Sequence, residues 1–251
     1  MLTLSSVSKN FGGLQVLQDV SLTIPGRGIF GLIGPNGAGK TTVFNLVTGL
    51  LAPTAGVIEF FGQRLSGMLP HRVTRCGIAR TFQNIRIFKE MTLIENVSVA
   101  LGSRPQYGAL SVLVPSRRFR EAERRETELA RDLLARVGLA DKAERPAGML
   151  SYGEQRRLEI ARALATEPKL LLLDEPAAGM NSVEKQQVMD EIIKLGESGL
   201  SILIIEHDMR FIMGLCGEIT VLNFGRVIAH GTPAEIRASP EVIEAYLGRE
   251  G

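Results

Sequence analysis

One short segment of the chain, residues 34–42, carries residues whose types and spacing suit the binding of a polyphosphate. It fits the pattern Gly-x-x-x-x-Gly-Lys-Ser/Thr. Glycines let successive backbone N–H groups turn toward a phosphate without a Cβ in the way, and the positive end of a following helix adds to the attraction. We expect Lys40 to reach the β- and γ-phosphates of a nucleotide and the Thr41 hydroxyl to bind Mg²⁺. The alternative is a glycine-rich surface turn. The residues expected around the nucleotide are Gly34, Pro35, Asn36, Gly37, Ala38, Gly39, Lys40, Thr41 and Thr42.

Two acidic residues follow an apolar run farther along the chain. Leu170–Leu173 indicates a buried strand, and Asp174 and Glu175 come directly after it. Asp174 is expected to hold Mg²⁺, directly or through water. Glu175 is expected to polarise the water that attacks the γ-phosphate. An apolar run that ends in acids is weak evidence alone, and it becomes strong downstream of a phosphate loop.

Three further side chains are candidates because of their positions. His207 lies just past the apolar run Ile202–Ile205, where an imidazole can orient the attacking water or Glu175. Gln83 can contact Mg²⁺ or that water through its neutral amide. Phe11 precedes the phosphate loop and can stack on adenine, although an aromatic residue considered alone more often belongs to a core.

Strands and helices that alternate along the chain must position these residues. Alternating apolar residues before residue 25 indicate antiparallel strands covered on one face. Continuous apolar runs such as Ile29–Ile33 and Ile202–Ile205 indicate buried strands, and helical spacing separates them. The predicted fold is therefore α/β, a phosphate-loop NTPase core with a mostly parallel sheet and an N-terminal antiparallel β subdomain.

The pattern changes in the middle of the chain, which indicates an inserted helical subdomain. Continuous apolar runs are missing there, and the charge-rich stretch Arg117–Arg136 carries Leu129, Leu133 and Val137 at helical spacing. Its arginine cluster is assigned to a solvated helix face, with contact to membrane headgroups as the alternative. We expect one domain over residues 1–251, with a core at about 1–83 and 156–251 and the helical subdomain at about 84–155.

Composition limits the classes of function. The 251 residues are 45% hydrophobic and 22% charged, as in a globular protein, and the net charge of +2 is too small to indicate a nucleic-acid partner. Cys76 and Cys216 lie far apart, which favours reduced thiols. The start of the chain shows no secretory signal, and no apolar run approaches the about 18 residues of a membrane span. The expectation is a soluble, cytoplasmic protein that meets a membrane only through a partner.

A sixth motif, Leu-Ser-Tyr-Gly-Glu-Gln at residues 150–155, is expected to start a helix. Ser151 suits the N-cap position and Glu154 has the spacing of a capping box, so many helices begin in this way. The motif also resembles the Leu-Ser-Gly-Gly-Gln signature of ATP-binding-cassette (ABC) ATPases. The order of all the motifs is similar to that of a complete cassette: Phe11, 34–42, Gln83, 150–155, 174–175, 176–181 and His207.

The chain departs from the general ABC pattern at three positions. Tyr152 replaces the first signature glycine, Glu154 replaces its glutamine, and Asn181 stands where aspartate is usual. Ser151 and Gly153 are kept, so we expect activity to be kept. The segments 77–86, 152–162, 176–181, 206–209 and 231–247 resemble the larger ATPase subunit of bacterial branched-chain amino acid importers. Importers for urea, short amides or aromatic acids share much of this pattern, which leaves the solute open.

The resemblance implies an ATP hydrolase that uses ATP and Mg²⁺. ATP on one chain is expected to be completed by Ser151, Gly153 and Glu154 of a second cassette, identical or paralogous. Transmembrane permease subunits are the implied partners, with docking near residues 84–88, and a periplasmic solute-binding protein takes part indirectly. The protein is expected at the inner face of the cell membrane, with no nucleic-acid partner.

Three other protein classes fit the motifs less well. A DNA-repair or chromosome-structuring cassette carries long coiled coils in its insert, but here the insert is short and lacks sustained heptads. A translation-factor protein needs two cassettes, and this chain has one copy of each motif. A nucleotide-binding regulator without turnover does not need an intact pair such as Glu175 and His207.

Overall fold

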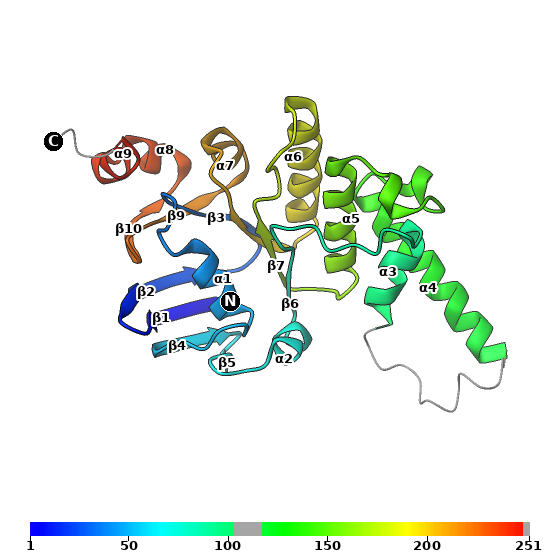
Figure 1. Ribbon diagram of the computed structural model, residues 1–251, viewed down its shortest axis with the longest axis horizontal. Helices are drawn as coiled ribbons and strands as arrows, with labels where there is room; N and C mark the ends of the chain where they lie inside the picture. The colour runs from blue at the N-terminus through cyan, green and yellow to red at the C-terminus, as the bar shows by residue number, and fades with distance from the viewer. Residues whose placement is uncertain (103–116, 248–251) are drawn as a thin grey trace.

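Two β-sheets organise the chain in the computed structural model, which describes residues 1–102 and 117–247 but not the side chains of 117–120 (Figure 1). The first sheet is antiparallel, in the order β2-β1-β4-β5. In β1, Leu2, Leu4 and Val7 are buried while Ser5 and Ser6 are exposed, so one face is covered, as predicted. The strands are β1 (Leu2–Phe11), β2 (Leu14–Ile24), β4 (Ala55–Phe60) and β5 (Gln63–Arg64).

The second sheet has six strands in the order β10-β9-β3-β8-β7-β6. Its neighbouring strands are parallel except for the hairpin of β9 and β10. The carboxyl ends of parallel strands meet at one edge of a sheet, so the segments that follow β3, β6, β7 and β8 meet there. The strands are β3 (Gly28–Ile33), β6 (Ile78–Arg80), β7 (Leu170–Asp174), β8 (Ser201–Ile205), β9 (Glu218–Asn223) and β10 (Arg226–Gly231).

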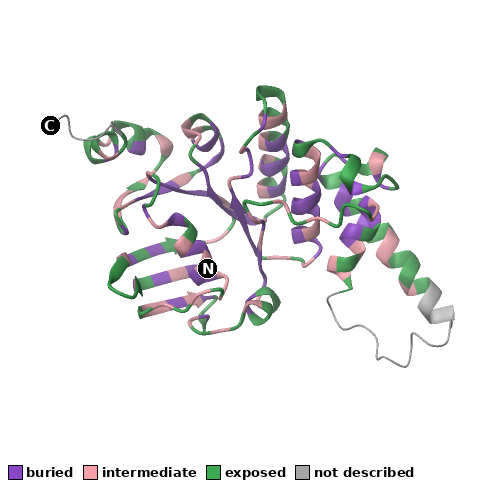
Figure 2. Cartoon of the chain, in the orientation of Figure 1, coloured by how far each residue is buried: buried purple, intermediate pink, exposed green. Residues whose placement is uncertain are grey.

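The central strands of this sheet are buried on both faces. In β7, Leu171 and Leu173 belong to the hydrophobic cluster on the helical side, whereas Leu170 and Leu172 belong to the cluster that includes the antiparallel sheet. Figure 2 shows these strands as buried segments at the centre of the molecule. Burial on both faces explains why the run is continuously apolar instead of alternating.

Helices cover both faces of the six-stranded sheet. Residues of α1 pack in the cluster with the antiparallel sheet, and residues of α5, α6 and α7 pack in the other cluster. No helix among the described residues is long and apolar enough to cross a membrane. The α-helices are α1 (Lys40–Val47), α2 (Pro70–Arg75), α3 (Leu93–Leu101), α4 (Arg117–Arg136), α5 (Tyr152–Leu164), α6 (Ser182–Glu197), α7 (Met209–Leu215), α8 (Pro233–Ala238) and α9 (Pro240–Leu247).

A helical subdomain stands at one end of the molecule, where α3, α4 and two short 3₁₀ helices, η2 (Ala140–Lys142) and η3 (Ala147–Met149), adjoin α5 (Figure 1). The helix predicted from the spacing of Leu129, Leu133 and Val137 is present; Leu133 and Val137 are buried, whereas Leu129 is 50% exposed. Ala130 and Leu134 complete the buried face. In the arginine cluster, Arg124 and Arg125 are exposed, whereas the side chains of Arg117, Arg118 and Arg120 lie outside the described part.

The predicted fold class is confirmed by the antiparallel sheet, the mostly parallel sheet and the inserted helices. The boundary expected at residue 155 falls inside α5, so this helix belongs in sequence to both parts. The division into 1–83, 84–155 and 156–251 therefore stays a prediction.

Candidate active site

The turn between β3 and α1 depends on glycine at two positions. Gly34 has φ of 149°, and a Cβ there would lie 2.0 Å from the carbonyl oxygen of Leu222. Gly39 has φ of 104°, and its Cβ would lie 2.5 Å from Cδ2 of Leu17. Conformation and space both require glycine here. Gly37, with φ of 80°, has no atom within 4 Å of an added Cβ, so this part of the turn is open.

The remaining residues of the turn present backbone and hydroxyl groups. Ala38 is buried, Asn36 and Thr41 are exposed, and Pro35 and Thr42 are partly buried. The N-cap of α1 provides no side-chain hydrogen bond to the first turn. The first N–H groups of this helix therefore remain available to an anion.

Lys40 lies over this loop and faces two acidic residues. Its Nζ donates to the carbonyl oxygens of Gly34 at 2.6 Å and Pro35 at 2.9 Å. Burial lowers the pKa of Lys40, and the negative charges of Glu175 and Asp174 oppose this shift. The loop carbonyls thus hold the ammonium at the phosphate-binding turn and near the carboxyl end of β7.

Asp174 is the last residue of β7 and is 3% exposed. Its Oδ2 accepts a hydrogen bond from Nη2 of Arg80 at 2.7 Å. The other terminal nitrogen of Arg80 donates to Oδ1 of Asn45, in α1, at 2.7 Å. Sequence analysis missed Arg80 and Asn45, and the only signal was the closeness of Arg80 to Gln83 in the chain.

Glu175 lies between the other two predicted catalytic residues. Its Oε2 accepts a hydrogen bond from Nε2 of Gln83 at 3.2 Å, and its Oε1 lies 3.8 Å from Nδ1 of His207. Its φ of 49° is in the left-handed region, and its N–H donates to the carbonyl oxygen of Ile205 at 2.8 Å. Such a backbone costs a non-glycine residue about 1–2 kcal/mol and must be held by its surroundings. The structure thus brings Glu175, Gln83 and His207 together.

A buried carboxylate, Glu206, holds the backbone around this group. It is 1% exposed and accepts hydrogen bonds from the N–H groups of Ala177 at 2.9 Å, His207 at 3.0 Å and Asp208 at 3.4 Å. It connects the segment after β7 with the segment after β8. Sequence analysis missed this role, although an acid that directly follows a buried strand was the available signal.

Arg156 connects α5 with the same group and was also missed. Its fully buried guanidinium donates to the carbonyl oxygens of Phe82, of Gln83 at 2.9 Å and of Glu175 at 3.3 Å. It also forms an ion pair with Glu159 at 2.8 Å. A movement of α5 would therefore be transmitted through Arg156 to the backbone of Gln83 and Glu175.

The signature begins α5, which packs on the other face of the six-stranded sheet from α1, the helix that follows the phosphate loop. The predicted capping box is confirmed, since Ser151 Oγ accepts from the N–H of Glu154 at 3.3 Å and the Glu154 carboxylate accepts from the N–H of Ser151 at 2.9 Å. Glu154 also pairs with Lys142. Gly153 is buried, and a Cβ there would lie 3.1 Å from Oε1 of Glu184. Within the described residues, no hydrogen bond or ion pair joins the signature to the phosphate loop.

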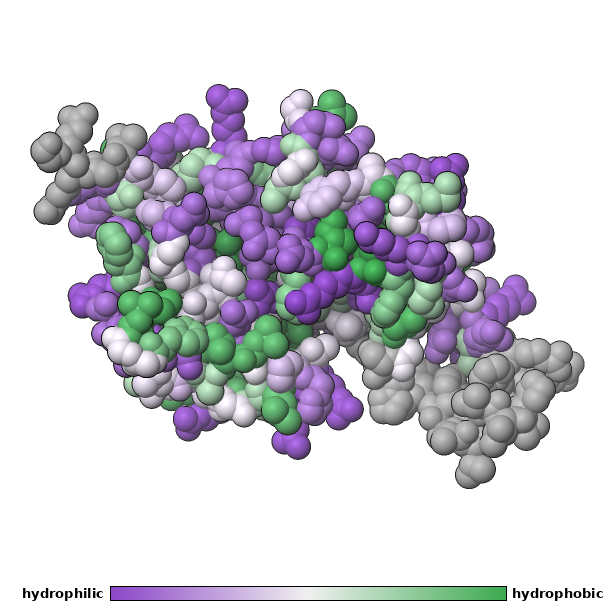
Figure 3. Space-filling model, in the orientation of Figure 1, coloured by the Kyte–Doolittle hydropathy of each residue, from purple (hydrophilic) through white to green (hydrophobic). Residues whose placement is uncertain are grey.

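Phe11 lies at the end of β1 and does not belong to either hydrophobic cluster. Its side chain is 46% exposed, and the Nζ of Lys9 lies 5.0 Å from the ring centroid. On the face shown in Figure 3, hydrophobic surface gathers over the antiparallel sheet. Leu14, the first residue of β2, is also exposed. The alternative of a core position for Phe11 therefore does not fit, and its contact with a nucleotide stays a prediction.

Comparison with known families decides the class of protein. A model described as ABC transporter matches residues 17–178, and a model described as branched-chain amino acid ATP-binding cassette transporter matches residues 226–251. The first match spans more than half of the chain and includes the phosphate loop, Gln83, the signature and Glu175. The chain belongs to the ATP-binding subunits of ABC transporters. Such subunits are ATPases, so the predicted enzyme class is confirmed.

Relatives of this ABC subunit match it along its length. The high-affinity branched-chain amino acid transport ATP-binding protein BraF of Pseudomonas aeruginosa is 45% identical over 249 residues, which cover 99% of this chain and 98% of BraF. The protein of the same description in Escherichia coli (strain K12), LivG, has the same identity and coverage. The lipopolysaccharide export system ATP-binding protein LptB of Escherichia coli (strain K12) is 36% identical over 249 residues, with 99% and 98% covered.

Solved structures share the fold of this ABC subunit. The ADP conformation of MJ1267, an ATP-binding cassette of an ABC transporter, matches with a TM-score of 0.86 and 30% identity, covering 99% of both chains. MJ0796, a dimeric ATP-binding cassette in a post-hydrolysis state bound to ADP and Pi, matches with a TM-score of 0.77 and 25% identity. That match covers 93% of this chain and 99% of MJ0796. The predicted resemblance to ABC ATPases is confirmed.

The donor groups at the site fit Mg²⁺ in an ABC subunit. The Thr41 hydroxyl, the Gln83 amide oxygen and the Asp174 carboxylate are all oxygen donors. Mg²⁺ is usually held through one or two protein carboxylates together with phosphate oxygens and water. The ion pair with Arg80 uses Oδ2 of Asp174, and Oδ1 takes no part in it.

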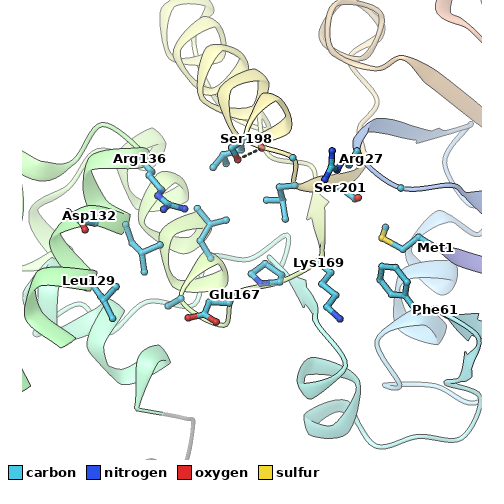
Figure 4. A pocket seen from close by; sticks show the side chains of 18 of the residues that line it. Met1, Arg27, Phe61, Leu129, Asp132, Arg136, Glu167, Lys169, Ser198 and Ser201 are labelled. Atoms are coloured by element: carbon cyan, nitrogen blue, oxygen red, sulfur yellow. Dashed lines mark hydrogen bonds between the residues drawn. The ribbon is translucent and has the colours of Figure 1, made fainter. Parts of the chain in front are cut away.

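A cavity of about 640 Å³ lies away from the phosphate loop of this ABC subunit (Figure 4). Arg27, Lys169 and Ser201 line it at the starts of β3, β7 and β8, together with Leu133 from α4. The phosphate loop, Glu175 and His207 instead follow the opposite ends of these strands, and none of the predicted site residues lines this cavity. A second cavity, of about 920 Å³, adjoins residues 35–38 of the phosphate loop.

Proposed function

We propose that this ABC subunit hydrolyses ATP to energise the import of branched-chain amino acids. The observation that carries the proposal is the Glu175 carboxylate, with Gln83 on one oxygen and His207 near the other, beside Asp174 and Lys40. This is the set that phosphoryl transfer to water needs: a base, groups that orient the water and a cation for the phosphates. The descriptions of the relatives BraF and LivG support the solute class.

In the proposed reaction, the phosphate loop binds the nucleotide through its backbone N–H groups. Lys40 exchanges its bonds to the loop carbonyls for bonds to the β- and γ-phosphate oxygens. Glu175 accepts a proton from the attacking water, which Gln83 orients through its amide. His207, which is 61% exposed, donates a hydrogen bond to the γ-phosphate from the end of β8. Phe11 stacks on the adenine.

Mg²⁺ is the proposed metal of this site. When bound, it neutralises charge that develops on the phosphates during transfer. Thr41, Gln83 and Asp174 would hold it, directly or through water. The buried ion pair with Arg80 holds the Asp174 carboxylate at this place.

The proposed site is completed by a second cassette, identical to this chain or paralogous. The helices that follow the phosphate loop and the start of the signature, α1 and α5, lie on different faces of the six-stranded sheet. One chain therefore cannot close its signature over its own nucleotide by a small movement. Ser151, Gly153 and Glu154 would act on ATP held by the other chain, and the dimeric form of the relative MJ0796 supports this arrangement.

Transmembrane permease subunits are the proposed membrane partners, and a periplasmic solute-binding protein would act through them. Residues 84–88 are proposed as the docking segment because they directly follow Gln83, and Phe88 is 46% exposed. One short segment would then contact the nucleotide site through Gln83 and the permease through residues 84–88. The subunit would lie peripherally on the inner face of the cell membrane.

Uptake of labelled amino acids into proteoliposomes that hold this chain and its permease partners tests the solute. We expect ATP-dependent uptake of leucine, isoleucine and valine in the presence of the solute-binding protein. Uptake of urea, short amides or aromatic acids instead would assign the subunit to a related importer.

Replacement of the base tests the catalytic role. Glu175→Gln should retain ATP binding and lose about 10²–10⁴-fold in hydrolysis rate, because the amide cannot accept the proton of the attacking water. A fluorescent ATP analogue measures binding, and phosphate release measures turnover. Hydrolysis at a near-normal rate by a folded variant would exclude Glu175 as the base.

A further inference from the structure

Arg80 links three elements on which the proposed mechanism depends. It ends β6, three residues before Gln83. Its Nη1 donates to Oδ1 of Asn45 and its Nη2 to Oδ2 of Asp174, each at 2.7 Å. Asn45 lies in α1, the helix that follows the phosphate loop, and Asp174 ends β7. Because a guanidinium is planar and its arms diverge at fixed angles, Arg80 fixes how α1 and the end of β7 lie relative to each other.

The Arg80 side chain is held in place within the chain itself. It is 6% exposed, and its guanidinium lies 5.4 Å from the ring centroid of Phe44 and 5.2 Å from that of Phe82. Its Nε is buried and, within the described part of the chain, has no hydrogen-bond partner. A buried unpaired N–H costs stability. Since Nε forms no hydrogen bond to a described residue, the guanidinium is held by the hydrogen bonds of its two terminal nitrogens and by its contacts with the two rings.

We propose that Arg80 is a positioning residue that orients the Asp174 carboxylate for the metal–nucleotide complex. The inference rests on the proposed role of Asp174 in holding Mg²⁺. Among the described residues, Arg80 is the side chain that forms an ion pair with Asp174. With Oδ2 fixed by Arg80, the carboxylate cannot rotate freely, and its second oxygen keeps one direction before the metal arrives. A ligand group that is already ordered loses less entropy when the ion binds.

Arg80→Met is the informative change. Methionine keeps an apolar side chain between Phe44 and Phe82 and removes both hydrogen bonds of the guanidinium. A hydrogen bond to a charged group corresponds to about a tenfold change in an equilibrium constant or more. We expect binding of the divalent ion with nucleotide to weaken about tenfold, while binding of ATP without metal stays within about twofold of the wild type.

Mn²⁺ is the probe, because the EPR signal of the free ion falls as the ion binds and the measurement does not require turnover. The full chain, saturated with a non-hydrolysable ATP analogue, is titrated with Mn²⁺ in the wild type, Arg80→Met and Arg80→Gln. Arg157→Met is the matched control, since Arg157 forms an ion pair with Glu191 at 3.0 Å, with side-chain exposures of 13% and 11%. That variant should lose stability but keep Mn²⁺ affinity within about twofold.

Unchanged or tighter Mn²⁺ binding by folded Arg80→Met would overturn the inference, since tighter binding would make Arg80 a competitor of the ion. If Arg80→Met does not fold, Arg80→Gln decides. It retains a hydrogen-bonding amide without the charge, and we expect several-fold weaker binding. Asp174→Asn distinguishes a failure of the role proposed for Asp174 from a failure of the role proposed for Arg80. If that variant keeps wild-type Mn²⁺ affinity, the proposed role of Asp174 fails, whereas wild-type affinity in the Arg80 variants alone refutes only the role of Arg80.

Discussion

Replacement of Glu206 by glutamine tests how the backbone around the catalytic group is held. The Glu206 carboxylate is 1% exposed, and its two oxygens accept hydrogen bonds from three backbone N–H groups, those of Ala177, His207 and Asp208. Glutamine has nearly the same shape but only one acceptor oxygen. Its NH₂ group must therefore face the N–H of Ala177 or those of His207 and Asp208.

The expected loss of stability follows from the number of N–H groups left without an acceptor. One or two buried donors lose their partner, at about 1–3 kcal/mol each, so the free energy of unfolding should fall by about 1–6 kcal/mol. His207 is one of these donors, and its Nδ1 lies 3.8 Å from Glu175. Displacement of a catalytic group by about 1 Å can reduce the rate about 10²-fold, so turnover should fall by about one to two orders of magnitude.

Urea unfolding and ATP turnover of Glu206→Gln provide the two measurements. Glu218→Gln is the control, because this carboxylate is 44% exposed and lies beside His230 at 3.7 Å. The control should change the free energy of unfolding by no more than about 0.5 kcal/mol. A Glu206→Gln chain with wild-type stability and wild-type turnover would refute the reasoning.

Three further predictions concern the loop, a buried acid and the signature. Lys40→Met should weaken equilibrium binding of a fluorescent ATP analogue by about tenfold or more, because it removes the cation at the phosphates; unchanged affinity would contradict that placement. Burial raises the pKa of Glu191 from 4.5 to about 7, so the folded chain binds a proton more tightly than the unfolded chain between these values. This group's contribution to stability should therefore fall by about 3 kcal/mol as the pH rises through that window. The free energy of unfolding of Glu191→Gln, measured with urea at several pH values, should lack that part of the pH dependence. An unchanged pH dependence would show that the pKa shift of Glu191 is absent. Ser151→Arg should bind ATP but not hydrolyse it, and mixing it with Lys40→Met should partly restore turnover. Full activity of Ser151→Asp would instead assign Ser151 to helix capping alone.

Local motifs made the catalytic group predictable. The phosphate loop is contiguous in sequence, and its two crowded glycines carry their own conformational reason. Asp174, Glu175 and His207 were predicted to be neighbours because each follows a buried strand, and β7 and β8 are adjacent and parallel. The sequence pattern is enough to predict where a residue lies when the end of a strand fixes its position.

Side chains that reach across the sheet were not predictable in the same way. Arg80 and Asp174 are 94 positions apart, and Arg80 and Asn45 are 35 apart. Their meeting depends on β6 being the strand next to β7, which no local pattern specifies. The exposure of Phe11 has a related reason, because its place in the sequence predicts a strand but not that the end of this strand lies beyond the hydrophobic cluster.

Three acids at the ends of β7 and β8 have different partners, and this difference supports the roles proposed for them. Asp174 is engaged by the Arg80 guanidinium, and Glu206 is engaged by three backbone N–H groups. Glu175 contacts a neutral amide at 3.2 Å and an imidazole at 3.8 Å, and its side chain is 23% exposed. Within the described residues, no arginine or lysine forms an ion pair with it. A carboxylate bound tightly to a cation is a poor proton acceptor, because the charge that a proton would neutralise is already compensated. Of the three acids, Glu175 is the one whose carboxylate is held neither by a cation nor by backbone N–H groups of the described part of the chain, which supports its proposed role as the base. The surroundings of Asp174 and Glu206 support the roles proposed for them in holding the ion and the backbone.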